Sequence, residues 1–225
     1  VLDSGRLVLG PENLAFERDL ARLSGRPHAI ATASGTAALH LALWALDLPA
    51  GGEVVVPAFT FPAPAHAAVA LGHRVRLVDV DADTWNLSVA RLEEVAGIDL
   101  AAIIAVDQFG LVAQLDAIAE IAQRCRAVLV EDAACALGAA LALRPAGSFG
   151  AAACFSFHPR KIVTTGEGGA VVVSDDTLAE RARAMRNHGQ VAPGRFGFAG
   201  LNFRLPETAA AMGRAQVERL TVMCE

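Results

Sequence analysis

The stretch HAIATASGTAALHLAL, residues 28–43, runs from a short apolar segment through Ser-Gly-Thr into alanines and leucines with helical spacing. A strand that leads directly into a helix is the repeating unit of α/β proteins. Similar short apolar segments recur at EVVVP (53–57), RVRLVDV (74–80), AAIIAVD (101–107), AVLVED (127–132), AACFSF (152–157) and GGAVVVS (168–174). The pattern therefore predicts a series of strands, each buried on both faces.

Helix-like windows separate these segments. They are PENLAFERDLARLSG (11–25), GTAALHLALWALDL (35–48), FPAPAHAAVALG (61–72), SVARLEEVAG (88–97) and LDAIAEIAQRC (115–125). Pro11 suits the first position of a helix and Gly25 suits a helix end. The alternation predicts one α/β domain, a mostly parallel central sheet flanked by helices, in which ligands bind beyond the carboxyl ends of the strands.

Composition excludes several classes of protein. The chain has 225 residues, a formal net charge of −5, and scattered arginines, which argues against a nucleic-acid surface. No stretch reaches the roughly 18 apolar residues that cross a bilayer. The four cysteines lack metal-type spacing, so we expect no metal site and reduced thiols. With no signal peptide visible, the prediction is a soluble cytoplasmic protein.

The segment SFHPRKIVTTGEGGAVV, residues 156–172, holds Lys161, the single lysine beside 18 arginines. A desolvated lysine can lose its proton and attack a carbonyl, which arginine cannot do. Taken alone, an ordinary surface cation explains Lys161 equally well. The neighbouring motifs must decide between the two readings.

Two further motifs carry polar groups to the predicted strand ends. Glu131 and Asp132 end the strand AVLVED, where carboxylates point into the ligand crevice or cap a helix. The Ser-Gly-Thr turn at residues 34–36 offers hydroxyls and free N–H groups at a helix start, which suits a phosphate, although helix capping alone also explains it. An amine, a strand-end acid and a phosphate cradle are together what pyridoxal 5′-phosphate requires.

The chain resembles the DegT/StrS family of sugar-nucleotide aminotransferases, which are pyridoxal-phosphate enzymes of fold type I. The resemblance spans the chain and is carried in family order by SGRLVLGPENLAFERDLARLSG, SGTAALHLALWAL, VVVPAFTFPAPAHAAVALGHRVRLVDVDADTWNL, VEDAACALGAA, GSFGAAACFSFHPRKIVTTGEGGAVVVSDD, RNHGQ and GLNFRLPETAAAMGRAQVERL. It implies that residues 1–225 form the large, cofactor-binding domain. The helix 206–225 would lead toward a smaller C-terminal domain that this sequence lacks.

Family likeness also implies a role for each matching residue. Lys161 would hold the cofactor as an internal aldimine and shuttle a proton, and Asp132 would pair with the pyridinium nitrogen. Phe61 would stack on the ring. The groups expected at the phosphate are Thr36, the Ala37 amide and the Ser156 hydroxyl, with Asn202 or, second, Arg204 from GLNFR reaching the phosphate of a neighbouring subunit in a homodimer. His158, close to the lysine, would support the site.

Some residues depart from the family pattern. Cys135 stands where relatives carry Gln, His or Glu against the ring oxygen, and a thiol is a weaker donor. Asp107 stands where His is common. The resemblance predicts amino transfer from an amino acid, most simply L-glutamate, to a ketosugar nucleotide, in polysaccharide or antibiotic sugar biosynthesis. The competing prediction is a non-catalytic or truncated cofactor-binding module with a regulatory role.

Overall fold

A seven-stranded sheet forms the centre of the protein in the computed structural model, which describes residues 1–97 and 100–225. The strand order is β1-β9-β8-β5-β4-β2-β3. Strand β9 runs antiparallel to β1 and β8, and the other neighbours pair in parallel, so the mostly parallel sheet is confirmed. The strands are β1 (His28–Thr32), β2 (Glu53–Pro57), β3 (Arg74–Val78), β4 (Leu100–Val106), β5 (Val128–Asp132), β8 (Ala152–Ser156) and β9 (Gly169–Val173).

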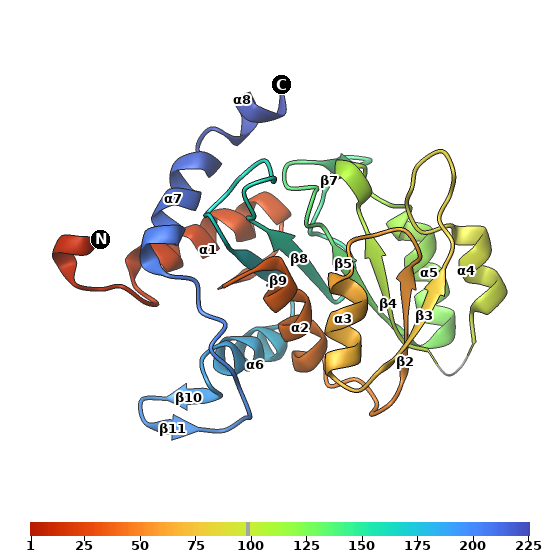
Figure 1. Cartoon of the computed structure of the whole chain (residues 1–225), viewed down its shortest axis with the longest axis horizontal. Helices are drawn as coiled ribbons and strands as arrows, with labels where there is room; N and C mark the ends of the chain where they lie inside the picture. The colour runs from red at the N-terminus through yellow and green to blue at the C-terminus, as the bar shows by residue number, and fades with distance from the viewer. Residues whose placement is uncertain (98–99) are drawn as a thin grey trace.

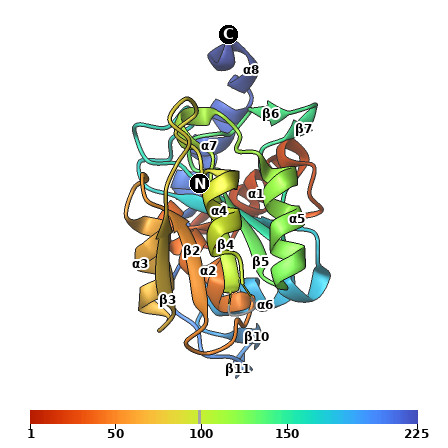
Figure 2. The ribbon, with the colours of Figure 1, turned by 90° about the vertical axis from the view of Figure 1, so that its right-hand side faces the viewer.

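Helices cover both faces of the sheet (Figures 1 and 2). One face packs against α2 (Gly35–Ala45), α3 (Ala63–Ala70) and α6 (Asp176–Arg186). The other packs against α1 (Pro11–Ser24), α4 (Val89–Val95), α5 (Leu115–Cys125), α7 (Glu207–Val217) and α8 (Leu220–Cys224). Among the described residues, no helix has the length and apolar character needed to span a bilayer.

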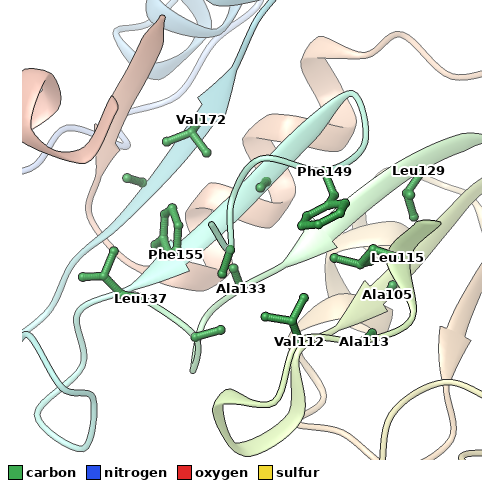
Figure 3. Packing of buried hydrophobic residues seen from close by; sticks show 14 of the residues in the cluster. Ala105, Val112, Ala113, Leu115, Leu129, Ala133, Leu137, Phe149, Phe155 and Val172 are labelled. Carbon is green, nitrogen blue, oxygen red and sulfur yellow. The ribbon is translucent and has the colours of Figure 1, made fainter. Parts of the chain in front are cut away.

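All strands of the central sheet except β3 are buried on both faces, because each contributes residues to two hydrophobic cores. The edge strand β3 differs from the prediction, since Arg74, Arg76 and Leu77 are exposed there. In β2, Val55 faces the core on the α1 and α5 side, while Val54 and Val56 face the core on the α2 and α3 side. Figure 3 shows part of the first core, with Phe149 and Phe155 among the packed side chains. Neighbouring residues of a strand therefore lie on opposite faces of the sheet. The same alternation sets the direction in which each carboxyl at a strand end points.

The N-terminal helix α1 begins and ends close to where its sequence signals place it. Pro11 is its first residue, and Gly25 follows its last residue with a φ of 65°. Glu207, the first residue of α7, stabilises the start of α1: its carboxylate accepts the backbone N–H groups of Gly10, Glu12 and Asn13. The starts of α1 and α7, far apart in the sequence, are thereby joined beside the sheet.

Several features differ from the sequence prediction. The helix expected over residues 206–225 is two helices, α7 and α8, which Glu218 and Arg219 separate. Helix α6 was not among the predicted windows, although Asp175 caps it by accepting the Leu178 N–H. Two small hairpins also appear, β6 (Ala140–Leu141) with β7 (Arg144–Pro145), and β10 (Gln190–Ala192) with β11 (Arg195–Phe196).

Candidate active site

A cavity of about 450 Å³ lies beyond the carboxyl ends of the central strands. Val106, Asp132 and Ser156 line it from the ends of β4, β5 and β8. The starts of α2 and α3 and the loops that follow β2, β4, β5 and β8 contribute the other lining residues. This is where open α/β sheets bind ligands, and the volume suits a small cofactor with part of a substrate.

Lys161 extends into this cavity from the loop that follows β8. Its backbone N–H donates to the carbonyl of His158 at 2.8 Å, which fixes a tight turn below the side chain. The amine Nζ donates to Sγ of Cys135 at 2.9 Å. His158 and Cys135 line the same cavity. The single lysine thus lines a cavity and is held there by Cys135, so it is not an isolated surface cation.

Asp132 faces the cavity from the last position of β5 and is only 4% exposed. Burial raises the pKa of Asp132 to about 6, although the Ala134 N–H and the Lys161 charge act in the opposite direction. The Ala134 N–H donates to Oδ1 at 3.1 Å. A carboxyl in this state ionises near neutral pH, and a cation placed against it would favour its charged form.

The start of α2 lies against the end of β8 in a geometry that suits an anion. Ser34 caps the helix: its Oγ accepts the Ala37 N–H at 3.0 Å. No hydrogen bond within the described ranges 1–97 and 100–225 uses the N–H of Gly35 or Thr36, so both amides stay available at the positive end of the helix. A Cβ on Gly35 would lie 2.7 Å from Cβ of Ser156, so glycine is required for this close approach.

The predicted site residues divide into two groups. Thr36, Phe61, Asp132, Cys135, Ser156 and Lys161 all line the one cavity. Ala37 is buried beside it, and its N–H already serves the helix cap, so the amides of Gly35 and Thr36 are better placed for an anion. Phe61 is 70% exposed at the mouth, with a free ring face for a planar ligand.

Asn202 and Arg204 do not line the cavity of their own chain. Asn202 forms a β-bridge with Asn187, and Nη1 of Arg204 donates to Oδ1 of Asn187 at 2.6 Å. Their expected role at the site of a second subunit stays a prediction.

One strand-end carboxyl does not point where its position suggested. Glu131 is fully buried on the face opposite Asp132, because adjacent strand residues alternate between faces. Its carboxylate accepts the N–H groups of Gly147 and Phe149. Conversely, Gln108 and Thr60 line the cavity and were not singled out from the sequence. Their position directly after a strand or in the loop beyond it is the signal that points to them.

Comparison with known proteins links these features to a family. The family model described as the DegT/DnrJ/EryC1/StrS aminotransferase family matches residues 1–225. GDP-perosamine synthase of Caulobacter vibrioides is 42% identical over 207 residues, which are 91% of this chain and 56% of that protein. The structure of S. venezuelae DesV superposes with a TM-score of 0.95 at 38% identity, covering 98% of this chain and 60% of that one.

DesI, solved in the presence of its TDP-sugar product, gives a TM-score of 0.91 at 39% identity over 98% of this chain and 56% of that one. The chain therefore spans somewhat more than half the length of the relatives it matches. The shared part is the large domain with its seven-stranded sheet.

Proposed function

Since the chain belongs to the DegT/DnrJ/EryC1/StrS aminotransferase family, we propose that it binds pyridoxal 5′-phosphate at Lys161 and transfers an amino group from L-glutamate to a ketosugar nucleotide. The observation that carries the proposal is the meeting of Lys161, Asp132 and the start of α2 in one cavity. These are the amine, the acid and the anion site that the cofactor needs.

The residues present fit the cofactor. The cavity has the volume for it, and Gly35 leaves Ser156 in contact with the helix start so that a hydroxyl and two free amides converge. Ser156, Thr36 and the Gly35 amide would hold the phosphate. Phe61 would cover one face of the ring, and Cys135 would lie against the ring oxygen.

When bound, pyridoxal 5′-phosphate supplies an electron sink for the electrons released at an amino acid's Cα. The protein's part is to orient and to move protons. Asp132 would hold a proton on the ring nitrogen by presenting its carboxylate, since a buried anion favours a cation beside it. Lys161, whose Nζ lies 2.9 Å from Sγ of Cys135, would hold the cofactor through its amine, with loss of water from the aldehyde. Once the incoming amino donor has displaced it, the free amine would accept the Cα proton of that donor.

The substrate class rests on the relatives. GDP-perosamine synthase is named for a nucleotide-linked sugar, and DesI was solved in the presence of its TDP-sugar product. We extend this to a nucleotide-linked ketosugar as amino acceptor here. A homodimer in which Asn202, or secondarily Arg204, reaches the partner's phosphate is part of the same proposal.

A spectrum of the purified chain with pyridoxal 5′-phosphate tests the proposal. We expect a visible band that L-glutamate converts to the absorption of the aminated cofactor, and that Lys161→Arg lacks, because arginine keeps the positive charge but cannot bond to the aldehyde. A band that forms but does not respond to glutamate would instead favour the competing function, a cofactor-binding module. Absence of the band in the folded wild type would refute both.

A further inference from the structure

A pair of carboxyls, distinct from Asp132, lies behind the cavity, on the face of the sheet that packs against α1 and α5. Asp107 follows β4 and Glu131 is part of β5, and both residues are fully buried. Ala105 is the register partner of Glu131, so Asp107, two residues beyond Ala105, faces the same side. The core around them includes Phe149 and Leu115 (Figure 3).

We propose that Asp107 holds the single proton of a buried Asp107–Glu131 carboxyl pair, and that this neutral Asp107 is a positioning residue for Asp132. The inference rests on the proposed function only for the role given to Asp132. The location of the proton is argued from the residues of this chain and does not depend on a bound cofactor.

The hydrogen bonds of the two carboxyls are asymmetric. Glu131 uses both oxygens as acceptors: Oε1 accepts the Gly147 N–H at 2.6 Å, and Oε2 accepts the Phe149 N–H at 2.9 Å. Asp107 uses one, since Oδ1 accepts the Ala113 N–H at 3.0 Å while Oδ2 is buried without a hydrogen-bond partner in the described structure. Two N–H donors favour the ionised form of Glu131, which leaves Oδ2 of Asp107 as the place for the proton.

The surrounding charges agree with this assignment. Burial, followed by the charge of Glu131, raises the pKa of Asp107 to about 9, and the charge of Asp132 adds to the effect. Burial also raises the pKa of Glu131, but its two backbone hydrogen bonds and the positive charge of Arg26 act to lower it. Lys161 acts on Asp132 from the cavity side. Two ionised carboxyls in this core would repel each other, so one proton is retained.

Asp107 also contacts the parts of the site that matter for a ligand. Its backbone N–H donates to the carbonyl of Asp132 at 3.0 Å, which fixes the end of β5. The hydrogen bond that its Oδ1 accepts from the Ala113 N–H closes the loop that begins with Gln108, a residue lining the cavity. Asp107 therefore anchors both walls through its backbone N–H and its Oδ1, and its neutral side chain leaves Asp132 as the carboxyl that carries charge toward the cavity.

Two variants distinguish the proton's location. Asp107→Asn keeps an oxygen for the Ala113 N–H and gives Glu131 a donor, so we expect it to fold about as stably as the wild type near pH 4 and more stably at neutral pH. Glu131→Gln places an NH₂ group against the N–H of Gly147 or Phe149, so we expect it to be clearly less stable. The opposite order of stability would overturn the assignment. The exposed Asp83→Asn serves as the matched control.

Measuring unfolding at a series of pH values tests the protonation of Asp107, because a purely structural role of this residue would give no dependence on pH. Asp107 ionises at an ordinary pKa in the unfolded chain but stays neutral in the folded chain, so rising pH favours unfolding of the wild type. The unfolding equilibrium constant of the wild type relative to Asp107→Asn should rise about tenfold per pH unit from about pH 4 toward 9. A ratio that does not change with pH would refute the proposal.

The titration of Asp132 completes the test without any cofactor. We expect its carboxyl to titrate near pH 6 by NMR in both the wild type and Asp107→Asn, because one neutral group replaces another. In Glu131→Gln the midpoint should fall, since a negative neighbour is lost. A similar fall in Asp107→Asn would show that Asp107 is ionised and would overturn the proposal, whether or not Lys161 captures the cofactor.

Discussion

Replacing Gly35 by alanine perturbs the anion-binding start of α2 with a single carbon atom. The added Cβ would lie 2.7 Å from Cβ and 3.1 Å from Oγ of Ser156, whereas ordinary contact begins at 3.4 Å, so the helix start or Ser156 must move by about 0.7 Å. Overpacking of this kind costs about 1–3 kcal/mol. The better helix propensity of alanine, worth up to about 1 kcal/mol, offsets this only in part.

Thermal unfolding of the cofactor-free chain measures the cost, since each kcal/mol lowers the Tm by roughly 2–4 °C in a chain of this size. The same displacement separates the Gly35 and Thr36 amides from the Ser156 hydroxyl, so the affinity for pyridoxal 5′-phosphate should also fall.

A double-mutant cycle supplies the control for this prediction. Ser156→Gly removes the obstructing Cβ, so Gly35→Ala should cost less stability in that background than in the wild type. Ser156→Ala keeps the Cβ and removes only the looser 3.1 Å contact with Oγ, so it should give much less relief. Equal costs in all three backgrounds, or an unchanged Tm and cofactor affinity in Gly35→Ala, would refute the close packing on which the anion site is argued.

Three more changes have defined outcomes. Glu207→Gln should lower the free energy of unfolding in urea by about 1.5–3 kcal/mol, because one acceptor at the start of α1 becomes a donor, while the exposed Glu218→Gln changes little. Burial acts to raise the pKa of Glu207, but hydrogen bonds from Asn13, Glu12 and Gly10 outweigh burial and hold the pKa below its ordinary value. The stability that ionised Glu207 contributes to the wild type should therefore be lost as the pH falls through the folded pKa, whereas Glu207→Gln should show no such loss. Asp132→Asn should keep cofactor capture but slow amino transfer by orders of magnitude in a single-turnover assay, and an unchanged rate would contradict its role. Phe61→Ala should weaken cofactor binding by about 0.5–1.5 kcal/mol or more in a titration, whereas Phe59→Ala, outside the cavity, should not.

The strands and most helices could be predicted because local patterns determine them. EVVVP is a strand over the predicted residues 53–57, and LDAIAEIAQRC is helix α5 from Leu115 to Cys125. The window over 35–48 ends earlier, at Ala45, since Asp47 takes a positive φ. An apolar run does not encode strand direction, so the reversal of β9 had no local signal.

Helix α6 was missed for a different reason. Its sequence DTLAERARAMR is mostly polar and charged, and only a narrow stripe that includes Ala179, Ala182 and Met185 is buried. The cap at Asp175 was the usable signal. The 206–225 segment looked like one helix because no proline or glycine marks the break at Glu218 and Arg219.

The candidate site was predictable where a motif fixes both residue and position, as at Lys161, Asp132 and the Ser-Gly-Thr turn. The sequence could not show which donors at the helix start remain free, because that depends on Ser34 accepting the Ala37 N–H. Nor could it show that Glu131 and Asp107 meet behind the sheet, since this follows from the register between β4 and β5. The free amides and the carboxyl pair both depend on how distant segments are placed in the fold.

The most direct measurement is to locate the covalent bond. The purified chain is incubated with pyridoxal 5′-phosphate, reduced with borohydride, digested and mapped by mass spectrometry, with Lys161→Arg as the charge-matched control. A phosphopyridoxyl group on the peptide carrying Lys161, and on no peptide of the control, is the predicted result. Label confined to the N-terminal amine, or equal label in the control, would contradict the claim that this amine is the cofactor's attachment point.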